Sequence, residues 1–220
     1  MSHLLCIETS TTNCSVAITN NEKVIVLSED YNNSYSHAER LHVFIKEVLA
    51  SAKIEMSAIA AVAVSKGPGS YTGLRIGVSA AKGLCYALDV PLISVPTLLS
   101  LSKQVEAKTG EFIIPMLDAR RMEVYASVFS SDYEVIRETK AEILDASSFS
   151  EYLEQGKVHF IGNGVEKFSK ICEHPNAVFI QKKLPSANEM ATVAYSKFSS
   201  RNFEDVSYFE PYYLKDFVAG

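Results

Sequence analysis

Two stretches of this chain follow the same predicted order of strands and helices. Short apolar or alternating runs in the first stretch indicate strands, and apolar residues at helical spacing indicate helices. The expected strands are Leu4 to Glu8, Ser15 to Thr19, Lys23 to Ser28, Ile59 to Val64 and Pro91 to Val95, with helices at Ser36 to Ala52 and Leu74 to Leu88.

The second stretch begins after a connecting helix near Pro96 to Val105. Its expected strands are Phe112 to Asp118, Glu123 to Phe129, Glu134 to Lys140, Val158 to Ile161 and Ala177 to Ile180, with helices at Ser147 to Glu154, Val165 to Ile171 and Ser186 to Arg201. The repetition predicts a duplicated α/β fold in which each unit is a mixed sheet with helices. We place the two units at residues 1–95 and 96–220.

A glycine-rich loop, Lys66 to Gly77, lies between a predicted strand and a predicted helix. It lacks the Gly-Lys pair of a phosphate-binding Walker loop, and it misses the third glycine of a dinucleotide fingerprint. A tight turn capped by Ser70 or Thr72 is the simplest interpretation. Ligand binding and close packing against a helix remain the functional alternatives.

Composition and charge exclude several classes of function. The chain is 47% hydrophobic and 21% charged, as is usual for a globular protein without membrane spans, and no apolar run has membrane-spanning length. The net charge of −5 argues against unassisted nucleic-acid binding, although basic spots occur at Arg75, Lys82, Arg120 and Arg121. Four scattered cysteines favour a reducing cytoplasm.

No metal site is predicted. His37 and His42 lie five residues apart, which places them roughly 140° apart around a helix, so they cannot share an ion. We expect both to be surface or interface histidines. The other histidines are isolated, and a His-Glu-x-x-His helix is missing from the sequence, so a metalloprotease is not expected.

Several segments carry a resemblance to a known family. The set resembles the TsaB family of tRNA threonylcarbamoyladenosine biosynthesis proteins, and the duplicated unit is similar to the actin, sugar kinase and Hsp70 ATPase group, an RNase H-like fold. The segments are Ile7 to Val16, Lys66 to Gly77, Ala81 to Leu84, Asp118 to Tyr125 and Pro211 to Leu214.

The resemblance implies a cytoplasmic, non-catalytic scaffold and activating subunit of the complex that forms N6-threonylcarbamoyladenosine (t6A) in tRNA. Its partner would be the catalytic paralogue TsaD, working with the ATPase TsaE, and tRNA would be bound only through the complex. No catalytic residue, required cofactor, membrane contact or peptidase activity is expected of this chain. Weak ATP or ADP binding at the interface with the partner is allowed.

The first hairpin loop offers candidate nucleotide-binding residues, which are Glu8, Thr9, Ser10 and Asn13. The group's ATPases place an aspartate where this chain has Glu8, and they need a glycine where Arg120 and Arg121 stand. Efficient hydrolysis is therefore not expected. The alternative function is an actin-like ATPase or small-molecule kinase that binds magnesium nucleotide at a cleft between the lobes through Glu8, Thr9 and Asp118.

The second predicted helix carries small residues every four positions, at Gly73, Gly77 and Ala81. Such a strip admits another helix at close range, either from the same unit or from a partner. We expect Leu41→Glu or Gly77→Leu to abolish pairing with TsaD and to leave the fold intact, and an unpaired interface allows a homodimer of the isolated chain. The predicted interface is Leu41, Phe44, Ile45, Val48, Leu49, Gly73, Leu74, Gly77, Ala80, Ala81 and Leu84.

Overall fold

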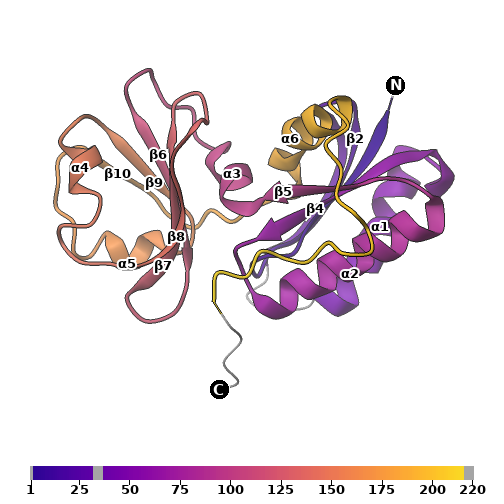
Figure 1. The fold of residues 1–220 in the computed structure, drawn as a ribbon, viewed down its shortest axis with the longest axis horizontal. Helices are drawn as coiled ribbons and strands as arrows, with labels where there is room; N and C mark the ends of the chain where they lie inside the picture. Colours follow the sequence, from indigo (N-terminus) through magenta and orange to yellow (C-terminus); the bar gives the residue numbers. More distant parts are fainter. Residues whose placement is uncertain (1, 32–36, 216–220) are drawn as a thin grey trace. The chain divides into compact units, whose positions relative to one another are not determined.

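The computed structural model describes residues 2–31 and 37–215. The chain divides into two compact units, the first formed by residues 1–100 together with 185–220 and the second by residues 101–184. Each unit is built on a five-stranded mixed sheet (Figure 1). Within the described residues, no helix combines the length and the apolar composition of a membrane span.

Unit 1 has the strand order β3-β2-β1-β4-β5, with β1 antiparallel to β2 and parallel to β4. Its strands are β1 (His3–Glu8), β2 (Cys14–Asn20), β3 (Lys23–Asp30), β4 (Ile59–Gly67) and β5 (Leu92–Pro96). Its helices are α1 (His37–Ala52), the short η1 (Met56–Ala58), α2 (Tyr71–Leu88), α3 (Thr97–Ser102), which runs into the second unit, and α6 (Ala187–Ser199).

Unit 2 repeats this topology in the order β10-β9-β6-β7-β8, again with an antiparallel hairpin pair on one side of the central strand and parallel strands on the other. The predicted duplication is therefore confirmed. Its elements are β6 (Phe112–Asp118), β7 (Glu123–Ser130), β8 (Val135–Ile143), α4 (Ser150–Leu153), β9 (Val158–Ile161), α5 (Val165–Phe168) and β10 (Ala177–Ile180).

The division into units differs from the expected boundary between residues 95 and 96. The predicted second unit would have included α6, but α6 packs on the sheet of unit 1. Ala187, Met190 and Ala194 lie against the side chains of Leu4 and Cys6, which β1 presents on one face of its sheet. The apolar face of α6 was visible in the sequence, whereas the sheet that it covers was not.

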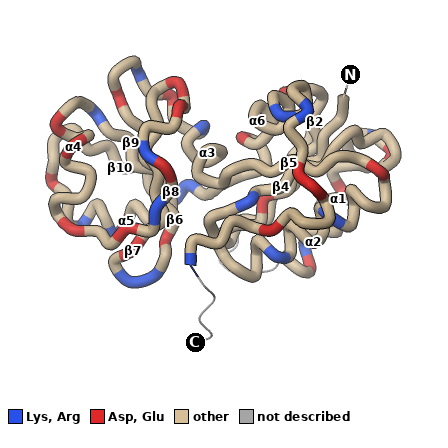
Figure 2. Tube along the Cα trace, in the orientation of Figure 1, with Lys and Arg blue, Asp and Glu red and all other residues tan. Residues whose placement is uncertain are grey.

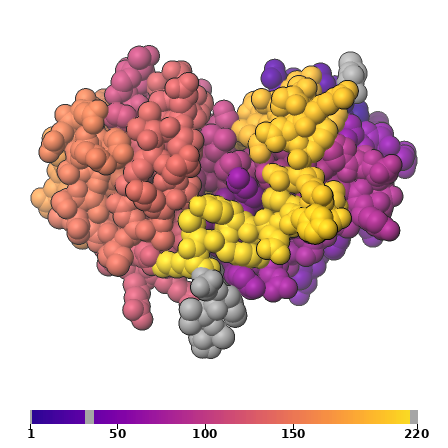
Figure 3. Space-filling model, viewed as in Figure 1, coloured from indigo at the N-terminus to yellow at the C-terminus, as the bar shows by residue number. Residues whose placement is uncertain are grey.

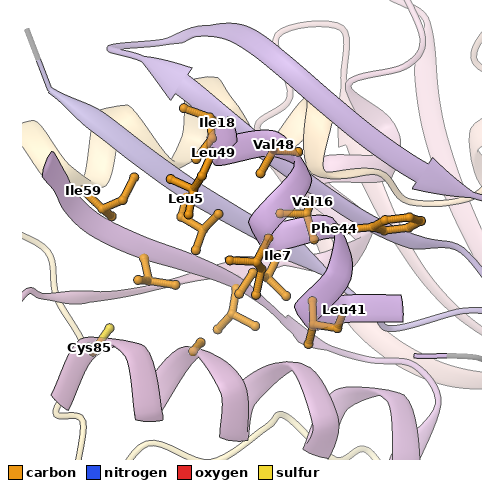
Figure 4. Close-up of a cluster of buried hydrophobic side chains, with 14 of the residues drawn as sticks. Leu5, Ile7, Val16, Ile18, Leu41, Phe44, Val48, Leu49, Ile59 and Cys85 are labelled. Atoms are coloured by element: carbon orange, nitrogen blue, oxygen red, sulfur yellow. The ribbon is translucent and has the colours of Figure 1, made fainter. Parts of the chain in front are cut away.

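The core of unit 1 lies under α1 and α2, on the opposite face of the sheet from α6. Because side chains alternate along a strand, Leu5 and Ile7 point to this second face. Figure 4 shows Leu41 of α1 and Cys85 of α2 on the side of these strand residues, and Phe44 of α1 belongs to the same buried cluster. The predicted helical spacing of α1 is thus confirmed, and Ser36, the first residue of the predicted helix, lies outside the described residues.

The predicted helices of unit 2 shorten to single turns. The Asp145 carboxylate accepts hydrogen bonds from the backbone N–H of Ser147 at 2.8 Å and from its hydroxyl at 2.7 Å. These hydrogen bonds stabilise a non-helical turn, so α4 begins only at Ser150. The core beneath α4 and α5 is rich in edge-to-face aromatic pairs among Phe149, Phe160 and Phe168.

Residues 203–215, which we term the C-terminal strap, run along the surface of unit 1 (Figure 3). The strap pairs with β5 through a bond from Glu204 N to Leu92 O of 2.9 Å, and Tyr212 N donates to Lys66 O at 2.7 Å. Lys82 of α2 donates to the carbonyls of Ser207 and Phe209 at 3.2 and 3.0 Å. The strap therefore contacts β4, β5 and α2 on the outer surface of unit 1.

Candidate functional site

The loop between β1 and β2, residues 9–13, is closed to solvent. Glu8, at the end of β1, is fully buried, and Thr9, Ser10 and Asn13 are at most 1% exposed. The structure thus brings the four predicted nucleotide-binding residues together in one loop. It does so inside the unit rather than at its surface.

The Glu8 carboxyl is held by two donors on one oxygen. Its Oε1 accepts from Ser10 N at 2.6 Å and from the Ser65 hydroxyl at 2.9 Å, whereas Oε2 has no hydrogen-bond partner among the residues described. Burial raises the pKa of this carboxyl above its ordinary value, and the donated hydrogen bonds oppose that rise only in part. Such a group favours the neutral acid, which is a poor ligand for magnesium.

The glycine-rich loop and the first turns of α2 cover this loop. Ser70 N donates to Ser10 O at 2.7 Å, and the Thr9 hydroxyl donates to Gly73 O at 2.8 Å. A Cβ atom added at Gly69 would overlap with Ser10, and one added at Gly73 or Gly77 would overlap with Thr9. These glycines therefore exist so that α2 can lie directly on the first loop.

This contact corrects the interpretation of the small-residue strip. Gly73 and Gly77 lie against Thr9 of the same unit, and His37 at the start of α1 also lies beside Gly73. Of the two predicted caps, Ser70 and Thr72, it is Ser70 that forms the N-cap of α2. Its hydroxyl accepts a hydrogen bond from Gly73 N at 3.3 Å. A phosphate could reach the loop only if this first turn of α2 moved away.

The first loop is also fixed from the side of α6. The Asn13 side-chain amide donates to Pro185 O at 2.9 Å and to the Glu29 carboxylate at 3.3 Å. On the other side, the His37 ring nitrogen Nε2 lies 2.7 Å from Thr11 O. His37 is 1% exposed, so the expectation of a surface or interface position is wrong for it, and burial lowers its pKa. His42 is exposed on α1.

The corresponding loop of unit 2 follows Asp118 and is open to solvent. Lys167 Nζ donates to the Asp118 carboxylate at 2.8 Å, to Arg121 O at 2.6 Å and to Glu123 O at 3.0 Å. Asn163, from the loop after β9, accepts a hydrogen bond from Asp118 N at 2.9 Å. Asp118 is therefore engaged by a lysine. In the parts of the chain that the structure describes, no three His, Cys, Asp or Glu side chains form a metal-binding group.

Comparison with known proteins places the chain in a family. The family model described as "TsaD: tRNA N6-adenosine threonylcarbamoyltransferase" matches residues 32–219. The Escherichia coli K12 tRNA threonylcarbamoyladenosine biosynthesis protein TsaB is 30% identical over 98% of this chain and 96% of its own length. The chain belongs to the TsaB family. The Haemophilus influenzae TsaB is 28% identical over 98% of this chain and 94% of its own length.

Solved structures support the same relation and show the fold. A Pseudomonas aeruginosa protein, described as uncharacterized and similar to the peptidase YeaZ, aligns with a TM-score of 0.86 at 25% identity, over 98% of this chain and all of that one. The activator of 2-hydroxyisocaproyl-CoA dehydratase from Clostridium difficile aligns at 0.50 with 9% identity, over 93% and 98% of the two chains. The predicted resemblance to TsaB and the duplicated actin-like α/β fold are both confirmed.

Most of the predicted interface residues of this TsaB-family chain lie in its own core. The five predicted interface side chains of α1 are at most 8% exposed, and Leu74 and Ala81 of α2 are buried as well. Of the predicted set, only Ala80 and Leu84 are partly exposed. The expectation that Leu41→Glu or Gly77→Leu would leave the fold intact is therefore wrong, because Leu41 is fully buried and a side chain at Gly77 would overlap with Thr9.

Apart from Ala80, the outward face of α2 was missed by the sequence analysis. A Cβ at Gly83 meets no described atom within 4 Å, and Tyr86 is 87% exposed. This outer face, as we term it, lies opposite Gly77 and Ala81 around the helix. A helical wheel drawn on the sequence would have placed it there. It consists of Thr72, Arg75, Ile76, Ser79, Ala80, Gly83, Tyr86 and Ala87.

Proposed function

We propose that this chain is the scaffold subunit of a complex that forms t6A in tRNA. The names of its relatives support the pathway, and the match to the TsaD family model supports descent from a common ancestor with the transferase. In this proposal the chain pairs with a TsaD-type transferase and works with a TsaE-type ATPase in the cytoplasm. It supplies no nucleophile, general base or metal ligand, requires no cofactor of its own, and meets tRNA within the complex.

One observation carries the non-catalytic part of the proposal, namely that α2 lies on the first loop. In a nucleotide-hydrolysing relative of this fold, the loop after β1 must be open to phosphate and its acidic residue must be ionised to hold the metal's waters. Here Thr9 and Ser10 are covered by α2, and the burial of Glu8 favours the neutral acid. This arrangement supports a structural role for the loop.

The outer face of α2 is the docking surface in our proposal. Ser79, Ala80, Gly83 and Ala87 are small, so a partner helix can approach the α2 backbone closely, and Tyr86 offers a large amphipathic side chain beside them. The occupant is the equivalent helix of the TsaD-type paralogue. A second copy of this chain could use the same face when the partner is missing.

Gly83→Arg tests this surface without damaging the fold, since a side chain there meets open space. We expect the variant to lose co-purification with the transferase paralogue from the same organism, while its circular dichroism and melting temperature stay close to wild type. The control is Ser196→Arg, which adds the same side chain to an exposed position of α6. Undiminished pairing of Gly83→Arg would refute the outer face as the interface.

An actin-like nucleotide enzyme is the second candidate, and one observation favours it. Three buried oxygen atoms of the first loop lack hydrogen-bond partners within the described residues, namely Glu8 Oε2, Ser10 Oγ and Asn13 Oδ1. An opened loop could direct them at a ligand. Calorimetric titration of the isolated chain with magnesium ATP separates the two functions. Tight, metal-dependent binding would favour the enzyme, whereas weak binding that needs the partner fits the scaffold.

A further inference from the structure

The loop that joins β6 and β7 holds two arginines in an unusual backbone conformation. Arg120 and Arg121 have φ angles of 72° and 46°, in the left-handed region that side chains disfavour. The hairpin between β2 and β3 uses Asn21 at a φ of 53°, a residue type that tolerates this region. Glycine or asparagine would form the β6–β7 turn more easily, so the turn alone does not explain the arginines.

The loop is fixed from below by the three hydrogen bonds of Lys167 described above. The same Asp118 oxygen that receives Lys167 also accepts from Arg120 N at 2.6 Å. The Asp118 carboxylate is therefore engaged by the backbone and by Lys167, and it forms no ion pair with Arg120 or Arg121 among the described residues. The loop presents its arginines from a preorganised backbone.

Three other arginine side chains have polar partners, whereas exposed Arg201, like Arg120 and Arg121, makes no hydrogen bond or ion pair with the described residues; what sets Arg120 and Arg121 apart is that they are adjacent in one loop. Arg40 pairs with Asp30 at 3.3 Å, Arg75 donates to the Tyr71 hydroxyl at 3.1 Å, and Arg137 pairs with Glu142 at 2.6 Å. Arg120 and Arg121 are exposed, and no hydrogen bond or ion pair engages either side chain in residues 2–31 and 37–215. Two adjacent cations on a fixed backbone are thus available to an external anion.

We propose that Arg120 and Arg121 form a contact site for the phosphates of an RNA backbone. The proposal rests on the function proposed above, because that function brings tRNA to the complex. A chain with a net charge of −5 needs a local basic contact to approach a polyanion, and the loop that follows β6 provides one at its tip (Figure 2). Guanidinium groups match phosphate geometry by donating two parallel hydrogen bonds.

Two other anions share this chemistry and are distinguished by experiment. A free mononucleotide carries phosphate but makes few contacts, so it should compete poorly with an RNA chain. An acidic protein segment carries carboxylates in place of phosphates. RNA is favoured because the adjacent arginines suit successive phosphates along one strand, and because the relatives act on tRNA according to their names.

The test measures binding of a fluorescein-labelled RNA hairpin to the full chain, alone and together with the transferase paralogue, by anisotropy over a series of salt concentrations. The double variant Arg120→Ala with Arg121→Ala should lower the magnitude of the slope of log affinity against log salt by about 1.4 to 1.8, since each lost phosphate contact contributes about 0.7 to 0.9. Affinity at the lowest salt concentration should fall by about tenfold or more.

A matched control removes the same charge elsewhere. Arg201 and Lys53 are also exposed and also have positive φ angles, of 55° and 56°, so Arg201→Ala with Lys53→Ala should leave the slope unchanged. Equal slopes for the wild type and the Arg120/Arg121 variant would overturn the site. Competition by ADP or by polyglutamate at the same charge concentration as RNA would overturn RNA as its ligand.

Co-purification with the transferase paralogue, measured on the same proteins, separates this site from the proposed function. The Arg120/Arg121 variant should pair as the wild type does. Failure of the wild type to pair would reject the scaffold role, and the salt slopes would still decide the RNA contact. Normal pairing with unchanged slopes would reject the RNA contact alone.

Discussion

At the scale of single residues, the glycines of α2 have opposite surroundings. Gly77 lies against the Thr9 side chain, which is itself buried and donates to Gly73 O, so neither neighbour has room to retreat. Gly83 lies on the same helix with open space in front of it. The same amino acid is thus required at one position for packing and costs helix stability at the other.

This contrast predicts opposite effects for one substitution. Gly77→Ala should lower the free energy of unfolding by about 1 to 3 kcal/mol, as expected for overpacking. Gly83→Ala should raise it by up to about 1 kcal/mol, because alanine favours the helix and meets no neighbour. Urea denaturation of the two variants beside the wild type measures both values. Equal signs would contradict the packing of α2 on Thr9.

The buried Glu8 carboxyl predicts a pH dependence. Burial raises its pKa above the 4.5 of an unfolded chain, so its favourable contribution is complete below pH 4.5 and is lost as the pH rises through the folded-state pKa. Glu8→Gln keeps an acceptor for Ser10 N and cannot ionise. The free energy of unfolding of the variant minus that of the wild type should therefore increase as the pH rises above 4.5.

Chemical denaturation at a series of pH values measures that difference, and His37, whose pKa is lowered, cancels because both proteins contain it. A difference that stays flat between pH 4 and pH 8 would show that Glu8 titrates as it does in the unfolded chain.

At the scale of elements, the C-terminal strap is held to α2 by a single charged side chain and by stacking. Tyr213 of the strap packs on Tyr71, the first residue of α2, with ring centroids 4.9 Å apart. Lys82 binds two strap carbonyls further along the helix. The strap borders the outer face of α2, so its attachment sets one edge of the proposed docking surface.

Lys82→Met keeps most of the side-chain volume and removes both hydrogen bonds to the strap. We expect the strap amides, that of Tyr212 included, to exchange with deuterium about tenfold faster, since a charge-assisted hydrogen bond at a partly exposed site stabilises by about 1 to 1.5 kcal/mol. Lys46→Met on the exposed face of α1 is the control. Unchanged strap exchange in Lys82→Met would mean that Tyr212 and Tyr213 hold the strap without it.

Hydrophobic periodicity predicted well the elements whose apolar side chains are buried against directly adjacent elements. The continuous apolar run of β1 and the amphipathic α1 were placed within one or two residues, because their patterns depend on the elements packed directly against them. Spacing alone could not tell which surface each apolar face would meet. The α1 residues from Leu41 to Leu49 were predicted as part of a partner interface, and in the structure they pack on the sheet of their own unit.

The candidate site, too, could be predicted from the sequence only in part. The sequence pointed to the first loop and to the glycines of α2 separately, and nothing in the spacing revealed that Thr9 and these glycines lie against each other across some sixty residues of chain. Lys167 carried no signal at all, since its role depends on the carbonyls of a loop far away in sequence. Contacts of this kind depend on how the fold brings distant segments of the chain together, which the spacing of residues in the sequence does not reveal.

At the scale of the whole molecule, two copies of one topology differ in the loop after the first strand. In unit 1 the loop after β1 is sealed by a helix, and in unit 2 the equivalent loop after β6 stays exposed and carries two arginines. The duplication has therefore produced one inward-facing and one outward-facing loop. The proposed scaffold role draws on the first unit, and the proposed RNA contact draws on the second.

The return of α6 and the strap to unit 1 has a consequence for biosynthesis. Unit 2 is continuous in sequence, whereas unit 1 needs residues from both ends of the chain. During synthesis the middle of the protein can complete its fold first, while the sheet of unit 1 leaves the ribosome with Leu4, Cys6 and their neighbours still uncovered. The residues of β1 are made well before the helix that covers them, so a chaperone has a long opportunity to bind there.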